Sequence, residues 1–158
     1  MPDMLVKLYN LEEKKEYKDE LLKKGIMIRK AISPEKHIIT KWIEKHFNEH
    51  WKSEAESAFS NNPVSILIAI DIEKGKMIGF SCYESTCKNF FGPTGVDEEY
   101  RGKGIGKVLY LQALYELKHM GYAYCIIGGA GPIDFYKKHS DAYVIENSSP
   151  GIYEGLLK

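Results

Sequence analysis

The chain has 158 residues, and its 22 lysines and arginines are balanced by 22 aspartates and glutamates. This length suits one domain built around a single core. The zero net charge gives no reason to expect nucleic acid or a membrane surface as a partner, and no apolar run is long enough to span a bilayer. We therefore predict one domain over 1–158, with an N-terminal strand and helix extension at 1–24 and a core at 26–158.

The cysteines indicate a reducing environment. Their number is odd and no Cys-x-x-Cys motif occurs, so free thiols in the cytoplasm are the expected state of Cys82, Cys87 and Cys125. The first residues, 1–4, show none of the charged and apolar features of a signal peptide. The histidines show no ligand spacing with the cysteines, so we expect no metal site.

The first half of the chain alternates charged and apolar stretches. It predicts an edge strand at 4–9, followed by a charged surface helix at 11–24. A strand at 26–31 and an amphipathic helix at 33–47 come next. Gly25 is a typical stop for the first helix, and Ser33-Pro34-Glu35 is a typical start for the second. A further helix carries Trp51 on its apolar face and ends before Asn61.

The second half is more apolar. It predicts a hairpin of strands at 64–72 and 77–83, then a third strand at 90–96. A long helix at 104–120, a strand at 122–127 and a short helix at 133–139 follow. A closing hairpin is expected from 143–145 and 152–157. Pro93 cannot donate to a sheet ladder, and Gly92 and Gly95 weaken a strand interior. The strand at 90–96 should therefore bulge or splay, which exposes backbone groups to an extended ligand.

The stretch from Val96 to Lys107 carries the strongest functional signal. It links the strand at 90–96 to the long helix and has glycines at three alternate positions, 102, 104 and 106. Glycines allow successive N–H groups to turn inward, and the first N–H groups of a helix have no intrahelical partner. This combination indicates an anion site, with phosphate as the usual ligand. Nearby lysines and an arginine add positive charge.

Two common phosphate loops do not fit this stretch. A P-loop would need glycine at Arg101 and a hydroxyl residue at Val108. A Rossmann fingerprint needs Gly-x-Gly-x-x-Gly, whereas the spacing here is Gly-x-Gly-x-Gly. The pattern Arg-x-x-Gly-x-Gly, with Val96 five residues upstream, resembles the acyl-CoA pyrophosphate loop of the Gcn5-related N-acetyltransferase (GNAT) superfamily.

The resemblance implies a fold of the α/β (α+β) class, with a mixed, mostly antiparallel central sheet, a splayed pair of strands and helices on both faces. It implies acetyl-CoA as cosubstrate and no metal. The residues implied to bind the cofactor are Val96, Arg101, Gly102, Lys103, Gly104, Ile105, Gly106 and Lys107. The Phe135-Tyr136 pair matches the family position where tyrosine is the usual general acid, so Tyr136 is the implied proton donor to the CoA thiolate.

The general base is open. An alkylammonium with a pKa near 10.4 must lose a proton before it attacks a thioester. Glu84 is the first candidate, because apolar neighbours would raise the pKa of its carboxyl towards neutrality. Asp71, His46 and a water relay without any single base are the alternatives. His46 also lies near His50 and Trp51, which form either ordinary core and surface or the wall of an acceptor pocket.

Two function classes follow. The first is an N-acetyltransferase that acts on a primary amine of a small molecule, and Tyr136 favours it. The second is a non-catalytic acyl-CoA-binding sensor or scaffold. It stays open because Gly129 stands where the family often has an asparagine that binds pantetheine, and because of the irregular strand. A nucleotide-binding protein is a distant third, and a homodimer is compatible with all of them.

Overall fold

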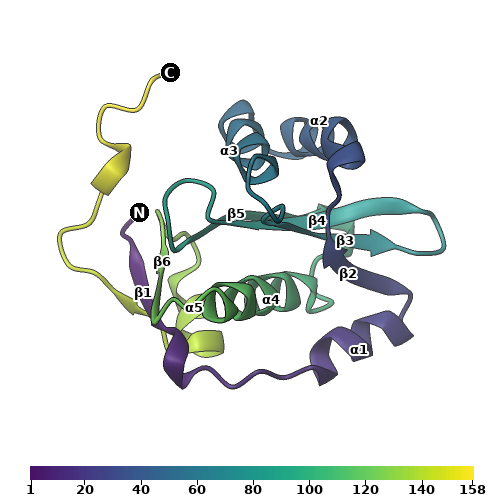
Figure 1. Ribbon diagram of the computed structural model, residues 1–158, viewed down its shortest axis with the longest axis horizontal. Coiled ribbons are helices and arrows are strands. Elements are labelled where there is room, and N and C mark those ends of the chain that lie inside the picture. The colour runs from purple at the N-terminus through teal and green to yellow at the C-terminus, as the bar shows by residue number, and fades with distance from the viewer.

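The computed structural model describes residues 1–158 and contains a mixed sheet of seven strands with helices on both faces (Figure 1). The strands are β1 (Met4–Lys7), β2 (Ile26–Lys30), β3 (Ile66–Asp71), β4 (Lys76–Tyr83), β5 (Phe90–Val96), β6 (Tyr124–Ile127) and β7 (Tyr143–Val144). The helices are α1 (Glu16–Lys23), α2 (Lys36–His46), α3 (Glu49–Phe59), α4 (Ile105–His119) and α5 (Ile133–Ser140). The strand order is β2-β3-β4-β5-β6-β1-β7, and only β5 and β6 run parallel.

The helices form two layers. Helices α2 and α3 cover one face of the sheet, and α4 crosses the other face with α1 and α5 beside it (Figure 1). The strand β3 is buried on both faces because its residues alternate between these layers. Ile66 and Ile68 pack in the core under α2 and α3, whereas Leu67 and Ala69 pack in the core around α4. The strand is Ile-Leu-Ile-Ala-Ile-Asp, and such a nearly continuous apolar sequence is typical of a strand covered on both faces.

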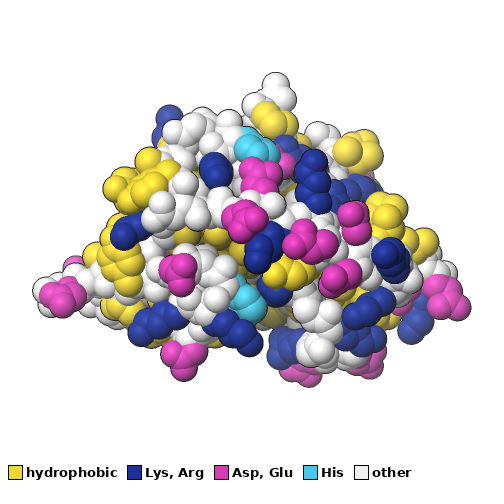
Figure 2. Space-filling view, turned by 90° about the horizontal axis from the view of Figure 1, so that it is seen from below, with side chains coloured by type: hydrophobic (Ala, Val, Ile, Leu, Met, Phe, Trp, Pro, Cys, Tyr) yellow, Lys and Arg dark blue, Asp and Glu magenta, His cyan; other side chains and the backbone are white.

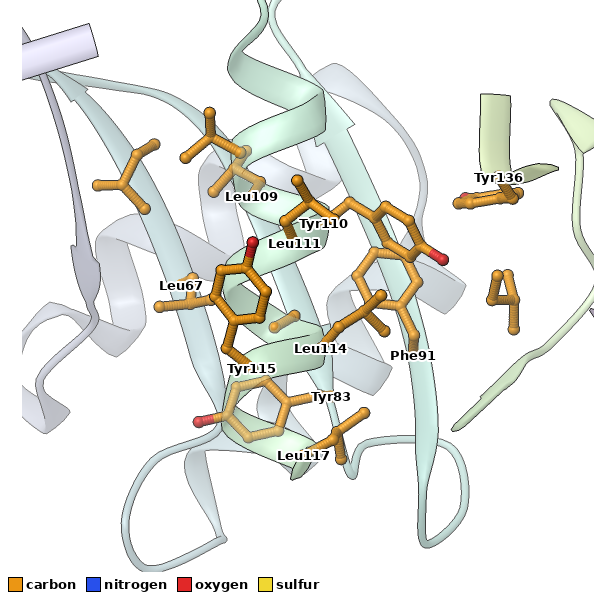
Figure 3. Packing of buried hydrophobic residues seen from close by; sticks show 14 of the residues in the cluster. Leu67, Tyr83, Phe91, Leu109, Tyr110, Leu111, Leu114, Tyr115, Leu117 and Tyr136 are labelled. Carbon is orange, nitrogen blue, oxygen red and sulfur yellow. The ribbon is translucent and has the colours of Figure 1, made fainter. Parts of the chain in front are cut away.

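The larger core is organised by α4. Nine of its fifteen residues are buried, because the helix is apolar on most of its circumference. Tyr110 and Leu114 are fully buried in this core (Figure 3). The outer side towards α1 and α5 carries charged side chains of both signs (Figure 2), which matches the solvated face expected of the charged N-terminal helix.

The N-terminal strand lies inside the sheet. Residues 4–9 were expected to form an edge strand, and that prediction is wrong, because β1 pairs with β6 on one side and β7 on the other. Met4 and Val6 are fully buried, and an edge position would leave more of their apolar surface in water. The stretch expected as a surface helix over 11–24 becomes helical only at Glu16–Lys23.

The expected closing hairpin does not form. Val144 pairs with Met4 rather than with the C-terminal stretch. Residues 152–157 contain no strand, and Gly151–Tyr153 forms a short 3-10 turn. Because β1 already occupies the inner edge of β7, the strand at 143–144 takes its hydrogen bonds from the N-terminus.

The strands β5 and β6 part after two residue pairs. Phe90 pairs with Ile126 and Phe91 with Ile127, and β6 then ends. The strand β5 continues to Val96, paired on its other side with β4. From Gly92 onwards, the edge of β5 that faces β6 therefore has no strand partner. This is the splay that the glycines and Pro93 predict.

Candidate acyl-CoA site

The glycine turn lies between the end of β5 and the first residue of α4. A 3-10 turn at Glu98–Tyr100 follows β5, and Gly104 is the N-cap of α4. Gly102 and Gly104 have φ of +81° and +82°, a region in which residues with a Cβ are strained. No neighbouring atom lies within 4 Å of a Cβ built at either position, so backbone conformation, rather than crowding, requires these two glycines.

Gly106 is different. Its φ is not positive, and a Cβ built there would lie 3.7 Å from Val96 Cγ2, an ordinary contact. The fold therefore does not need glycine at this position in the first turn of α4. A ligand that approaches the backbone of this turn closely would need it.

Arg101 is held against the end of β5. Its Nε donates to the carbonyl of Val96 at 3.1 Å, and its guanidinium lies 3.9 Å from the Glu98 carboxylate. Val96 and Arg101 line a cavity of about 430 Å³ together with His46 and Phe47 from the end of α2. The Phe47 ring lies on Gly95 so closely that a Cβ there would be 2.2 Å from it.

The two lysines of the loop rest on tyrosines. Lys103 Nζ lies 5.2 Å from the centroid of Tyr100, and Lys107 Nζ lies 3.5 Å from that of Tyr17. Such cation–π contacts are weak at exposed positions, and Lys103 is exposed. Lys103 can therefore be recruited by a stronger anionic partner at the helix start.

Asp71, one of the candidate bases, supports the turn that precedes the glycine loop. The Tyr100 hydroxyl donates to Asp71 Oδ2 at 2.6 Å, which joins the turn before the loop to the end of β3. This hydrogen bond lowers the pKa of the Asp71 carboxyl, although partial burial opposes it. The Asp71 carboxylate is therefore engaged by the Tyr100 hydroxyl at the end of β3, where it holds the turn in place.

Tyr136 lies beside the point where β5 and β6 part. Its ring packs at 6.3 Å from Phe91, the last β5 residue paired with β6, and at 5.0 Å from Tyr110 (Figure 3). Burial raises the pKa of its phenol to about 12. The hydroxyl is therefore protonated at neutral pH and can donate a proton but cannot accept one.

Glu84 and Tyr136 are not brought together. Glu84 follows β4, and its backbone N–H donates to the carbonyl of Phe90, at the closed end of the splayed pair. Its carboxylate accepts hydrogen bonds from the Asn89 N–H and, at 3.0 Å, from the Tyr122 hydroxyl. These contacts fix the bend after β4. His46 in turn lies 3.6 Å from the Asp97 carboxylate.

One supporting residue was missed in the sequence. Asp3 Oδ1 accepts a 2.8 Å hydrogen bond from the N–H of Gly129, in the loop after β6, and the carbonyl of Pro2 accepts from Ala130. Asp3 is only 8% exposed. No local pattern could have indicated this contact, because 126 residues separate the partners.

The sequence model of the acetyltransferase (GNAT) family matches residues 36–140. The match covers most of the chain and includes both the glycine turn and Tyr136. The chain therefore belongs to this family. No curated protein matches the chain.

Solved structures share the fold at low identity. A GCN5-related glucosamine N-acetyltransferase region of a fungal multi-domain GH3 β-N-acetylglucosaminidase aligns with a TM-score of 0.74 and 18% identity, over 91% of this chain and 19% of that one. A GCN5-related N-acetyltransferase from Sphaerobacter thermophilus aligns with a TM-score of 0.71 and 17% identity, over 91% of this chain and 48% of that one. A GNAT family acetyltransferase from Brucella melitensis, solved in complex with acetyl-CoA, aligns with a TM-score of 0.55 and 20% identity, over 72% of this chain and 80% of that one. The chain thus spans less than half of the first two proteins.

No three His, Cys, Asp or Glu side chains lie close enough together to hold a metal ion. No helix has both the length and the apolar character that crossing a membrane requires.

Proposed function

We propose that the chain transfers the acetyl group of acetyl-CoA to a primary amine of a small molecule by direct attack on the thioester. The observation that carries this proposal is the position of Tyr136 beside the splay that leads to the glycine turn. Family membership supports the acetyltransferase chemistry. The three unpaired cysteines, of which Cys82 and Cys125 are buried, favour a reducing compartment such as the cytoplasm.

The described residues fit acetyl-CoA. The start of α4 offers N–H groups and dipole charge to a pyrophosphate, and Arg101 lies beside them. The unpaired edge of β5 from Gly92 to Val96 offers backbone donors and acceptors to an extended pantetheine arm. Acetyl-CoA supplies the activated acetyl group.

The chain's residues then have distinct tasks. A backbone N–H on the open edge of β5 can stabilise the oxyanion that develops on the carbonyl. Tyr136 gives its proton to the departing sulfur as the C–S bond breaks and recovers one from the nitrogen that has formed the C–N bond. Net turnover converts an ammonium and a thioester into an amide, a thiol and one proton.

A thermal melt tests the binding part of the proposal. A ligand at 100 times its Kd stabilises the folded state by about 2.7 kcal/mol, which corresponds to a rise in Tm of roughly 5–11 °C for a chain of this size. We expect this shift with millimolar acetyl-CoA and none with NAD or GTP. A Tm raised by NAD or GTP but not by acetyl-CoA contradicts the proposal.

A non-catalytic acyl-CoA-binding sensor or scaffold is the second candidate. It is favoured by Glu84, the first candidate base, which is bound into a bend at the closed end of the splay. A panel of amines, with release of the CoA thiol as the readout, separates the two functions. An enzyme releases thiol with at least one amine, and a sensor shows the thermal shift without turnover.

A further inference from the structure

A half-buried carboxylate lies on the face of the sheet opposite Tyr136. Glu54, on α3, accepts a hydrogen bond of 2.5 Å at Oε1 from the Thr86 hydroxyl. Ser85, the residue before Thr86, donates to the backbone carbonyl of Glu54. These contacts clamp α3 to the bend after β4. The second carboxylate oxygen, Oε2, accepts no hydrogen bond from the protein.

Neighbouring residues place this carboxylate near the splay. Ser85 and Thr86, which hold Glu54, follow Tyr83 by two and three residues. Tyr83 pairs with Phe91, the last β5 residue bonded to β6. Glu54 therefore lies close to the level at which the two strands part, on the side covered by α3.

The C-terminal segment closes the same region. A Cβ built on Gly128, the residue after β6, would lie 3.0 Å from the Tyr153 hydroxyl oxygen and 3.0 Å from the Phe90 ring. Burial raises the pKa of Tyr153, the Glu54 carboxylate raises it further, and contact with Thr86 lowers it. Tyr153 thus packs beside Gly128 and lies within electrostatic reach of Glu54.

Successive residues of β5 separate the two faces. Phe91 packs with Tyr136 in the core around α4, and Phe90 lies with Tyr153 against Gly128. Side chains of adjacent strand residues point to opposite faces. The proposed proton donor and the free carboxylate oxygen thus belong to opposite sides of the splay.

We propose that Glu54 binds the ammonium group of the acceptor and takes its proton, and that Thr86, Phe90 and Tyr153 complete the acceptor site. This inference rests on the proposed function. The step is a proton transfer from R–NH₃⁺ to the carboxylate, which leaves a neutral amine for attack and a carboxylic acid that releases the proton to water. Tyr136 handles only the later protons.

The surroundings suit Glu54 to this task. Burial raises the pKa of its carboxyl, while the Thr86 hydroxyl and the nearby His50 lower it. A carboxylate with a raised pKa is a stronger base, which narrows its gap to an alkylamine. The groups that face it are His50 on the same helix, Cys82 on β4 and Tyr153 on the C-terminal segment.

The same arrangement selects a substrate class. An acceptor with a carboxylate next to its amine would place a like charge beside Glu54, which is unfavourable. The rings of Phe90 and Tyr153 favour a cation or an apolar group beside the amine. The acceptor is therefore a primary amine without an adjacent carboxylate, such as an arylalkylamine, a polyamine or an amino sugar.

The test compares pairs of amines in the full chain. Phenethylamine and phenylalanine differ only by the carboxylate, as do tyramine and tyrosine, and spermidine and glucosamine extend the panel. We expect thiol release with at least one amine that lacks the carboxylate, with kcat/KM at least 10-fold above any α-amino acid. Glu54→Gln should lower kcat/KM by about 100-fold or more and leave the Kd of acetyl-CoA within twofold.

Glu56→Gln is the matched control. It removes the same charge from the same helix, and two residues turn the side chain by roughly 200° away from Glu54. We expect its kcat/KM to equal that of the unmodified chain. Glu54→Asp should recover part of the activity that Glu54→Gln loses. An unchanged kcat/KM in Glu54→Gln, or α-amino acids used as well as the matched amines, overturns the inference.

Binding alone separates failure of the inference from failure of the proposed function. If no amine is acetylated, titration calorimetry with phenethylamine and with spermidine, in the presence of free CoA, replaces the kinetic readout. Binding to the unmodified chain that Glu54→Gln loses upholds the acceptor site and rejects the enzyme. Equal binding in both proteins, or none in either, rejects the acceptor site.

Discussion

The carboxylate of Asp3 accepts a hydrogen bond of 2.8 Å from the backbone N–H of Gly129 and so joins the N-terminal strand to the loop after β6. Asp3 is 8% exposed, and a buried N–H without a partner costs about 1–3 kcal/mol. We expect Asp3→Ala to lower the free energy of unfolding by that amount. Asp3→Asn, which keeps an acceptor oxygen in place, should lose less. Urea denaturation of both variants measures this, and equal losses would argue against the hydrogen bond as the cause.

Two glycines of the turn should respond in opposite ways to alanine. Gly104 has φ of +82°, so Gly104→Ala should destabilise the fold by about 1–2 kcal/mol. Gly106 lies in the first turn of α4 with normal φ, so Gly106→Ala should leave the Tm unchanged or raise it.

Acetyl-CoA affinity then separates fold from binding. We expect Gly106→Ala to weaken binding although its fold is intact, because the added Cβ stands where phosphate approaches the backbone. Gly106→Val should weaken it further. Isothermal titration with acetyl-CoA is the measurement, and an affinity of Gly106→Val equal to that of the unmodified chain would place the pyrophosphate elsewhere.

Tyr136→Phe should reduce turnover without loss of cofactor. We expect kcat to fall by roughly 10- to 1,000-fold, because a general acid contributes about 10² to 10⁴ and water replaces part of it. The Kd of acetyl-CoA should change little. Steady-state kinetics with an accepted amine measures the effect.

Tyr110→Phe is the control for this prediction. Tyr110 belongs to the same aromatic cluster, but its hydroxyl is hydrogen-bonded to Ser140 at 2.6 Å. Its loss should lower stability by about 1 kcal/mol and leave kcat unchanged. If both variants lose kcat equally, the cluster acts through packing and Tyr136 is not the acid.

The raised pKa of Glu54 predicts how its replacement changes stability with pH. Burial lifts the pKa of the folded-state carboxyl above the ordinary value of 4.5. Folding therefore favours the protonated form, and this stabilisation is present below pH 4.5 and is lost as the pH rises through the folded pKa. Glu54→Gln should thus raise the Tm near pH 8 and give no gain near pH 4.

Thermal melts of both proteins at the two pH values are sufficient. His50, on the same helix, lowers the pKa of the Glu54 carboxyl. The comparison is therefore repeated in a His50→Asn background. A gain from Glu54→Gln that is as large at pH 4 as at pH 8 would mean that the effect does not come from ionisation of the carboxyl.

The central segment of the fold could be read from local spacing. The hairpin of β3 and β4, the helix α4 and the short helix α5 lie within a few residues of the predicted ranges. Their signals are periodic apolar residues and turn residues, which act over one element or between neighbours. The glycine turn belongs to the same group, because φ at Gly102 and Gly104 is a property of each residue's own backbone.

The catalytic candidates also differ in whether short-range or long-range contacts determine their position. The place of Tyr136 beside the splay follows from a helix that directly succeeds β6. Glu84 was a candidate base because it follows the apolar strand that ends at Tyr83, but the bend after β4 turns its carboxylate towards Asn89 and Tyr122. A partner 38 residues away decides this contact, and spacing carries no information about it.

The sequence alone determined the family, the order of most elements and the place of the glycine turn, because these depend on short-range patterns. Only the tertiary structure decided that β1 lies between β6 and β7, that Asp3 supports the loop at Gly129, and that Thr86 is hydrogen-bonded to Glu54. The physical reason is that burial and hydrogen bonding are satisfied between segments far apart in the chain. The apolar pattern of Met4 and Val6 would allow their strand to be buried at several positions in the sheet. The strand takes the position between β6 and β7 because the rest of the chain leaves the edges of these two strands unpaired.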